Sequence, residues 1–594
     1  MEHYKVNQKD ILFILKEQLN YGSLCSLDRY KDLNEKSLDM AVTEAIKFAD
    51  GVVDPLQKIG EEWGVKLKDG KVSCAPEFRE AFKQYAENGW LAISADAQYG
   101  GQEFPFLINM VVNDLMSGAC QSFEMCPGLT HGAARLIESF ATEEHKERFV
   151  RRMYSGEWAG TMALTEPDSG SDLSGIKTMA FREGDHFKIK GTKIFISWGD
   201  HDVADNIIHM VLAKIEGAPE GTKGISLFIV PKIRVNEDGS LGEPNDVVCE
   251  KVEEKLGIHA SPTAELNFGT HDGCIGYLCG DECKGLACMF QMMNGARIST
   301  GVSGMAMAST AYQNALAYAK ERIQGPDITR QKKGPVAIIN HPDIRRMLLW
   351  MKAMVEGMRS MIYASAMWLD FSQTAADADK RARYDALVDF MVPIIKAYCS
   401  DMGFRVCETA MQCYGGYGYC KDYPIEQYLR DTKIMSIYEG TNGIQALDLM
   451  GRKMRINDGA PVRVFMEEIG SFCKKNQDHP RLGGAVKELG KMVEKLMEVS
   501  AKLGALAMSD LPQWASTTYP ALLSFGDAIA CWMLLDMAIA AQKAIDGGKD
   551  NPFYQGKVLQ ALYFIKVTLP EAVARMDSCV REGREVVEMP AEAF

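Results

Sequence analysis

Residues 437–445 read Ile-Tyr-Glu-Gly-Thr-Asn-Gly-Ile-Gln, and they place the carboxyl group of Glu439 between an aromatic ring and a glycine. The sequence on either side has the apolar spacing of helices, so this stretch interrupts a helical region. Two interpretations are open from these residues alone. Glu439 is either an exposed turn residue or a base in a partly apolar pocket. In such a pocket, burial would raise its pKa and allow it to abstract a proton from carbon.

A second loop, far upstream, fits the same chemistry. Residues 163–173 read Ala-Leu-Thr-Glu-Pro-Asp-Ser-Gly-Ser-Asp-Leu. Pro167 interrupts any helix, and Gly170 can adopt backbone angles that other residues avoid. The hydroxyls of Thr165 and Ser171, with nearby backbone N–H groups, could surround a polar heterocycle with hydrogen bonds and leave its face free. The alternative is an ordinary polar turn that leads into a strand.

Together, the two loops resemble the flavin loop and the catalytic loop of the acyl-CoA dehydrogenase family. Further segments match that family in order and spacing, namely 193–197 (Lys-Ile-Phe-Ile-Ser), 255–257, 261–263, 412–419 and 430–431. The resemblance covers about residues 80–455. With the additions at both ends, the chain resembles the long bacterial branch of the family, which includes dehydrogenases of 3-methylmercaptopropionyl-CoA and of long fatty acyl-CoAs.

The expected fold is mainly α-helical with a central β domain. Apolar residues recur at helical intervals before residue 160 and again after residue 285, whereas segments such as 186–190 alternate as strands do. In family terms this is an N-terminal helical domain, an antiparallel β barrel and a four-helix bundle, followed by an extra C-terminal helical domain. We place these domains at residues 1–160, 161–280, 281–455 and 461–594, with a linker at 457–461.

The resemblance implies a specific reaction. Removing the α-proton of a thioester requires a base beside the carbon and donors around the carbonyl oxygen. Glu439 is expected to abstract that proton, while N5 of FAD takes the β-hydride, so that an acyl-CoA becomes the trans-2-enoyl-CoA. Some relatives carry the base on the long helix, at the position of Ala296, which cannot act as one. The expected substrate is 3-methylthiopropanoyl-CoA or a saturated fatty acyl-CoA.

The resemblance also assigns binding residues. The expected contacts with FAD are Leu164, Thr165, Gly170, Ser171, Phe195, Ser197, Arg322, Gln412, Gly416 and Thr441. Three of them, Arg322, Gln412 and Gly416, match positions that reach FAD across a subunit interface, which implies a homodimer at least. The expected substrate contacts are Ser171, Arg297, Tyr438 and Glu439. The chain departs from the family pattern at Phe195, where tryptophan is frequent, in the longer segment 323–340, and at Asn442-Gly443.

Composition limits the partners. The net charge of −14 makes nucleic acid and anionic membranes poor partners. The apolar run 522–541 contains Asp527 and Asp536, which favours a packed helix over a membrane span. The N-terminus lacks the apolar core of a signal peptide, so we expect a cytoplasmic protein whose 16 cysteines are reduced. The spacing of Cys279, Cys283 and Cys288 matches no common ligand pattern, so no metal is expected.

Two other functions remain open beside a dehydrogenase that passes electrons to an electron-transfer flavoprotein. An acyl-CoA oxidase would use oxygen, and such enzymes also have extra C-terminal helices. A DNA-associated flavoprotein on the same scaffold would need a basic surface, and the acidic balance of the chain argues against it. We further expect the C-terminal extension to cover the face that shorter relatives use to form tetramers, which would leave a dimer.

Overall fold

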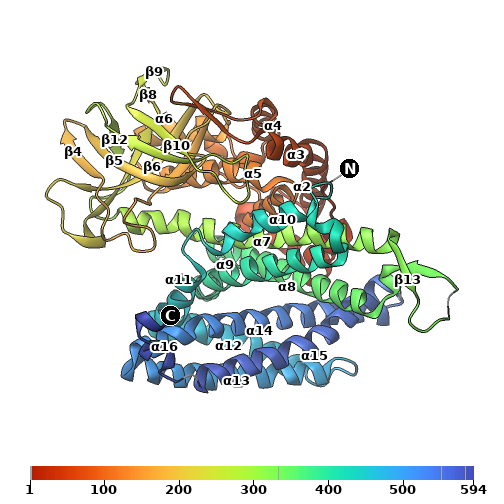
Figure 1. The fold of residues 1–594 in the computed structure, drawn as a ribbon. Coiled ribbons are helices and arrows are strands. Elements are labelled where there is room, and N and C mark those ends of the chain that lie inside the picture. Colours follow the sequence, from red (N-terminus) through yellow and green to blue (C-terminus); the bar gives the residue numbers. More distant parts are fainter. Residues whose placement is uncertain (1–2, 332, 550, 582) are drawn as a thin grey trace. The chain divides into compact units, whose positions relative to one another are not determined.

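The structure is a computed structural model that describes residues 3–331, 333–549, 551–581 and 583–594. The chain divides into two compact units (Figure 1). Unit 1 contains residues 3–4 and Met40–Ser299, and unit 2 contains Lys5–Asp39 and Thr300–Phe594. The helix-rich fold with a central sheet agrees with the sequence prediction.

The helices of unit 1 precede and flank its sheet. They are α2 (Glu35–Phe48), which begins in unit 2, α3 (Asp54–Trp63), α4 (Pro76–Glu87), α5 (Phe106–Phe140) and α6 (Glu143–Tyr154). Helix α5 is kinked at Cys120, where φ is −154° and ψ is 98°. Helix α6 begins after Thr142, whose side chain accepts a hydrogen bond from the backbone N–H of His145 and so satisfies one donor of the first turn.

The strands of unit 1 form one large sheet and two small hairpins. The large sheet consists of β3 (Trp158–Ala163), β4 (Met179–Glu183), β5 (His186–Ser197), β6 (Asn206–Ile215), β7 (Ile225–Pro231), β10 (Val247–Val252), β11 (Thr263–Phe268) and β12 (Ile275–Leu278). The hairpins are β1 (Lys66–Lys68) with β2 (Lys71–Ser73), and β8 (Ile233–Val235) with β9 (Leu241–Pro244).

The large sheet closes into a barrel, as predicted, because β4 pairs with both β5 and β6 and so completes the ring β5-β12-β7-β6-β4. The prediction that all strands are antiparallel is wrong for two pairs, since β3 and β4 both run parallel to β6. Parallel neighbours need a long crossover connection. Residues 164–205 provide one between β3 and β6, and they carry the candidate flavin loop.

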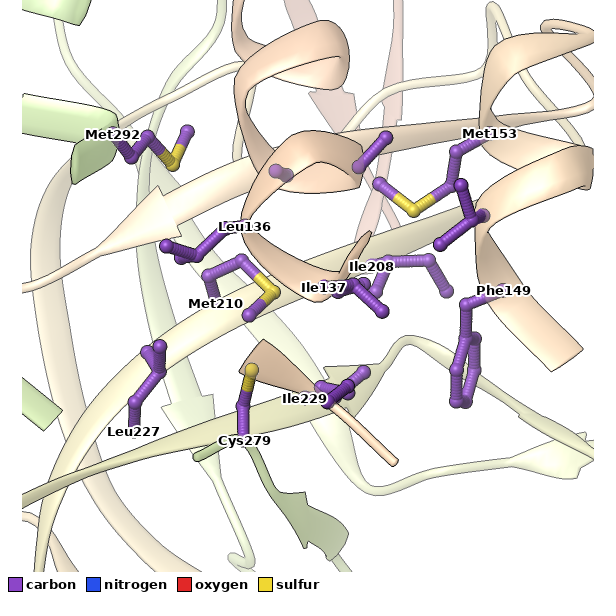
Figure 2. Close-up of a cluster of buried hydrophobic side chains, with 14 of the residues drawn as sticks. Leu136, Ile137, Phe149, Met153, Ile208, Met210, Leu227, Ile229, Cys279 and Met292 are labelled. Atoms are coloured by element: carbon purple, nitrogen blue, oxygen red, sulfur yellow. The ribbon is translucent and has the colours of Figure 1, made fainter. Parts of the chain in front are cut away.

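Both faces of β6 are buried, because successive side chains of a strand point to opposite sides. On one side, Ile208 and Met210 belong to a core shared with α5 and α6, whereas Val211 and Ala213 belong to a core inside the barrel. Figure 2 shows the first core, where side chains from α5, α6, β6 and β7 converge. Its labelled members are Leu136, Ile137, Phe149, Met153, Ile208, Met210, Leu227, Ile229, Cys279 and Met292.

Unit 2 is helical. Its elements are most of α7 (Gly285–Glu321), then α8 (Pro342–Thr374), α9 (Ala378–Tyr414), α10 (Ile425–Thr432), α11 (Asn442–Leu447), α12 (Ile456–Asn476), α13 (Gly483–Ser509), α14 (Leu511–Asp546), α15 (Pro552–Arg581) and α16 (Glu585–Glu588), with the hairpin β13 (Ile323–Pro326) and β14 (Pro335–Ala337). The small residues of α7 allow close packing. A Cβ on Gly304 would lie 2.8 Å from the carbonyl oxygen of Cys399 in α9.

The predicted linker coincides with a break inside α12. Asn457, Asp458 and Gly459 have φ angles of 50°, 54° and 73°, which no α-helix contains. Beyond it, α14 lies against α13, α15, α8 and α9. Among the described residues α14 is long and apolar enough to cross a membrane, and most of that apolar stretch is buried inside the protein.

Residues 5–39 belong to unit 2 rather than with the helices that follow them in unit 1. Helix α1 (Gln8–Phe13) and the π-helical turn Ile14–Gln18 carry the contacts responsible. Asp10 Oδ1 accepts a hydrogen bond of 2.6 Å from Lys557 of α15, and Glu17 accepts one of 2.8 Å from Tyr554. These polar contacts add to the burial of Ile11 and Phe13.

Candidate active site

The candidate flavin loop follows β3 in unit 1. Two backbone hydrogen bonds between Glu166 and Ser169, of 2.9 and 3.0 Å, close a tight turn inside the loop. The carbonyl oxygen of Thr165 accepts a further hydrogen bond of 2.9 Å from the N–H of Ile194, which joins the loop to β5. Leu164 is buried and Thr165 is half-buried, whereas Gly170 and Ser171 are exposed. The loop therefore presents polar groups to the surface of unit 1 from a fixed base.

Phe195 stands on a β-bulge in β5. Ala264 and Leu266 of β11 pair with Ile196 and Lys193, so β5 contains one extra residue at this point. Phe195 lies at the bulge and has a φ of 57°, a backbone conformation that bulky residues rarely adopt. Bulges re-aim side chains, and here Ile196 stays buried while Phe195 is 58% exposed. Ser197 ends the strand, half-buried.

The Glu439 loop lies in unit 2, between the 3-10 turn Lys433–Ser436 and α11. Glu439 has a φ of 59°, so the backbone is left-handed at a residue that seldom adopts this conformation. The side-chain amide of Gln445 donates to the carbonyl oxygens of Glu439, at 3.2 Å, and Gly440, at 3.3 Å. Tyr438 and Glu439 are both half-buried. The hydroxyl of Thr441 caps α11 by accepting from the N–H of Ile444.

Asn442 anchors this loop to α9, and its only sign in the sequence is the departure from the family pattern. Its side-chain amide donates to the carbonyl oxygen of Ala397 at 3.2 Å and to the hydroxyl of Ser400 at 3.0 Å. Its Oδ1 accepts a hydrogen bond of 2.8 Å from Lys396. All four residues are buried. Gln445 and Asn442 thus hold the loop at Glu439 and on its C-terminal side.

The remaining predicted residues lie in both units. In unit 2, the guanidinium of Arg322 lies 5.6 Å from the centre of the Tyr417 ring, which brings Arg322 beside the exposed segment that contains Gly416. Gln412, close to the end of α9, is also exposed. In unit 1, Arg297 is buried on α7, next to the half-buried Ala296.

The cysteines behave as core residues. Most of the sixteen are buried, and all are free. Burial raises the pKa of the Cys279 thiol to about 12, so the thiol form persists at neutral pH. Over the part of the chain that the structure describes, no three His, Cys, Asp or Glu side chains gather as a metal site would require.

Comparison with known domain families gives four consecutive matches. The N-terminal, middle and C-terminal domains of acyl-CoA dehydrogenase match residues 37–157, 161–270 and 283–454. A domain described as acetyl-CoA dehydrogenase C-terminal like matches residues 465–590. The last match shows that the C-terminal extension is itself a recurrent feature of related proteins.

Similar proteins share the full length of the chain. The 3-methylmercaptopropionyl-CoA dehydrogenase of Ruegeria pomeroyi is 35% identical over 96% of this chain and 97% of its own length. A butyryl-CoA dehydrogenase of Syntrophomonas wolfei is 37% identical over 100% of this chain and 99% of its own. A broad-specificity linear acyl-CoA dehydrogenase of Mycobacterium tuberculosis is 34% identical over all of both chains.

Solved structures share the fold. ACDH-11 of Caenorhabditis elegans, in complex with C11-CoA, superposes with a TM-score of 0.75 at 20% identity, over 95% of this chain and 93% of its own. An acyl-CoA dehydrogenase of Bacillus anthracis, complexed with FAD, gives a TM-score of 0.71 at 22% identity, over 96% and 92%. With the sequence matches along its whole length, the chain belongs to the acyl-CoA dehydrogenase family.

Proposed function

We propose that this protein is an FAD-dependent dehydrogenase that converts an acyl-CoA thioester to the trans-2-enoyl-CoA, with Glu439 as the base that removes the α-proton. The observation that carries the proposal is the Glu439 loop. A carboxylate stands at the family's catalytic motif on a left-handed residue whose carbonyl is held by Gln445. Strained conformations of this kind persist only where the surroundings enforce them, and they gather at active sites.

The restraint of the loop explains how Glu439 would work as a base. A general base must stay within hydrogen-bond reach of the proton that it removes. Gln445 holds the carbonyl of Glu439 and Asn442 holds the chain three residues later, so the backbone of the base is restrained. Ala296 offers no competing base on α7. The backbone N–H of Glu439 would then bind the thioester oxygen, where negative charge develops as the proton leaves.

The residues of unit 1 fit a flat polar cofactor. An exposed aromatic ring at Phe195 adjoins a loop with exposed polar groups at Gly170 and Ser171, and the two are joined by the hydrogen bond between Ile194 and Thr165. When bound, FAD supplies the acceptor for the hydride that leaves the β-carbon. The residues of unit 1 that would hold it are Leu164, Thr165, Gly170, Ser171, Phe195 and Ser197, and the family resemblance adds Thr441, which belongs to unit 2. In a homodimer, Arg322, Gln412 and Gly416 would hold the FAD of the second subunit.

The substrate we propose is 3-methylthiopropanoyl-CoA or a saturated fatty acyl-CoA, with Ser171, Arg297 and Tyr438 among its contacts. Relatives of similar identity are named for 3-methylmercaptopropionyl-CoA, butyryl-CoA and linear acyl-CoAs, which supports this range. We also propose an electron-transfer flavoprotein as electron acceptor, a dimer as the working assembly and a cytoplasmic location. Dye reduction without oxygen, compared with peroxide formation in air, separates this acceptor from an oxidase reaction.

Flavin bleaching tests the proposal. The purified protein, loaded with FAD, is mixed without oxygen with 3-methylthiopropanoyl-CoA, butyryl-CoA, octanoyl-CoA and palmitoyl-CoA, and absorbance is followed. We expect bleaching by at least one of these compounds. Glu439→Gln should retain FAD and bleach about 10³-fold more slowly, a typical contribution of a general base. Glu408→Gln, at an exposed position of α9, is the matched control. Bleaching of Glu439→Gln at the wild-type rate would reject Glu439 as the base.

A further inference from the structure

Lys193 of β5 is fully buried, with no exposed side-chain surface. Lysine is almost never buried to this extent unless it is paired. Its ammonium group has two partners, the carboxylate Oε1 of Glu166 at 2.8 Å and the backbone carbonyl oxygen of Leu164 at 2.9 Å. Both partners belong to the candidate flavin loop, and Lys193 lies two residues before Phe195. One buried cation therefore connects the loop to the strand that carries the exposed ring.

Stability alone does not explain this arrangement. Burial lowers the pKa of Lys193 to about 8, although the charge of Glu166 opposes the shift. Burial acts to raise the pKa of Glu166, but Lys193 and the hydrogen bonds from Lys177 and Thr178 outweigh it and lower that pKa overall. Buried ion pairs can often be replaced by apolar residues without loss of stability. The buried pair of Lys193 and Glu166 is therefore a candidate for a role other than stabilising the fold.

The geometry of the peptide bond indicates that role. In a trans peptide the carbonyl and the following N–H point in opposite directions. Lys193 reaches the Leu164 carbonyl oxygen from the buried side, so the N–H of Thr165 is turned away from that side. The next carbonyl, of Thr165, is held by the N–H of Ile194. Across the described residues, no protein acceptor binds the Thr165 N–H.

We propose that Lys193 is a positioning residue of the FAD site, which clamps the Leu164 carbonyl and so directs the Thr165 N–H toward the cofactor beside Phe195. The inference rests on the proposed function, because it assumes that FAD binds at this loop. Glu166 has a different task. It balances the buried charge and is itself held by the N–H groups of Lys177, at 2.5 Å, and Thr178, at 3.1 Å.

Three variants separate the two tasks. Glu166→Gln leaves the ammonium of Lys193 on the Leu164 carbonyl, so the protein should lose stability while its FAD dissociation constant changes less than about threefold. Lys193→Met removes the hydrogen bond to the Leu164 carbonyl and leaves the buried carboxylate of Glu166 without its cation. The double variant of Lys193→Met with Glu166→Gln carries no stranded charge, so it should regain a near wild-type melting temperature. It should still bind FAD about 10- to 100-fold more weakly, because a hydrogen bond from a charged donor is missing.

The measurements are FAD binding by fluorescence quenching, thermal melting, and hydrogen exchange of the backbone amides of residues 164–166 before FAD is added. We expect those amides to exchange faster in the double variant than in Glu166→Gln. A second ion pair in unit 1, between Lys232 and Asp200, is the control. Asp200 is 3% exposed and so as buried as Glu166, although Lys232 is 30% exposed. Its double variant, Lys232→Met with Asp200→Asn, should leave FAD affinity unchanged.

The outcomes are distinguishable. If the wild-type protein fails to bind FAD, the proposed function is wrong and this inference falls with it. If the wild-type protein binds FAD and the double variant at Lys193 and Glu166 binds it equally well, only the inference is overturned, and the pair is merely structural. The inference is also overturned if Glu166→Gln weakens FAD binding as much as Lys193→Met does.

Discussion

Lys557→Met should release residues 5–19 from unit 2. The side chain of Lys557 is 1% exposed, and its ammonium group lies 2.6 Å from both Asp10 of α1 and Glu356 of α8. The only other cation at these carboxylates, among the described residues, is Lys352, which is 3.3 Å from Asp10 and also contacts Glu356. The two carboxylates are 4% and 3% exposed. The variant therefore leaves two buried carboxylates with a single lysine between them.

The expected magnitude follows from that charge imbalance. Removing one member of a buried ion pair destabilises a protein by about 3–5 kcal/mol, because the other charge remains buried without compensation. Methionine keeps the apolar contact with Phe13 and Phe553, whose ring centres lie 5.1 and 4.9 Å from the lysine nitrogen. The loss is thus electrostatic. Since each 1.36 kcal/mol is a factor of ten, opening of the segment should become roughly 10² to 5 × 10³ times more frequent.

Hydrogen exchange of the backbone amides of residues 8–18 measures this opening directly. Lys16→Met is the matched control, since Lys16 and its partner Asp39 are 35% and 32% exposed, and an ion pair that water reaches contributes about 1 kcal/mol or less. The combined variant of Lys557→Met with Glu356→Gln restores the balance of charge and should recover most of the protection. If Lys557→Met and Lys16→Met accelerate exchange equally, the reasoning about the buried charges is refuted.

Two further predictions concern the loop and the pH dependence. Gln445→Leu removes the donor to the carbonyls of Glu439 and Gly440, so stopped-flow flavin reduction should slow about 10- to 100-fold while acyl-CoA affinity changes little; an unchanged rate would contradict the restraint. Burial lowers the pKa of His209 to about 3, from 6.5 when unfolded. Between these values the unfolded chain binds the extra proton, so stability falls as pH falls below 6.5. When the free energy of unfolding is measured in urea from pH 4.5 to 6.5, it should rise with pH by about 1.4 kcal/mol per pH unit less in His209→Gln than in the wild type. An unaltered rise would rule out a contribution from His209.

The pattern of apolar residues predicted those helices and strands whose burial is regular along the chain. Helix α13 buries one apolar stripe, α8 and α9 are long apolar segments that are buried on all sides near their middle, and β5 alternates in part, so these patterns are visible in the sequence. The break at 457–459 was also predictable, because Asn, Asp and Gly tolerate positive φ angles. The small side chains along α7 permit the close approach of another helix, which is α9.

The bulge at Phe195 could not be predicted in the same way. Strict alternation places Lys193 and Phe195 on one face of β5, whereas the extra residue sends one inward and the other outward. Nothing in the propensity of phenylalanine favours a positive φ. The conformation is imposed by the pairing with β11, and pairing between distant segments has no local signal. For the same reason, the family motif could suggest Glu439 but not its anchors at Asn442 and Lys396.

Residues 5–39 illustrate the limit for domain assignment. Their apolar spacing predicts burial, but it does not tell which surface buries them. The decisive contacts are polar and distant, between Tyr30 and Asp370 at 2.6 Å, and between Asp10 and Lys557. The charge of buried Asp10 is balanced by two lysines that are distant in the sequence, Lys557 and Lys352, which its local sequence does not reveal.

The union of residues 5–39 with α8 and α15 has a consequence for protein synthesis. The ribosome produces α1 first and Lys557 only hundreds of residues later. Until then the nascent chain exposes Ile11 and Phe13 without their final neighbours, and such exposed apolar surface attracts chaperones or other chains. Completion of unit 2 therefore waits for the end of translation, however early unit 1 has folded. A premature stop before α15 would yield a product that contains the Glu439 loop but lacks Lys557 and Tyr554, the contacts that bind α1 and the turn after it to α15.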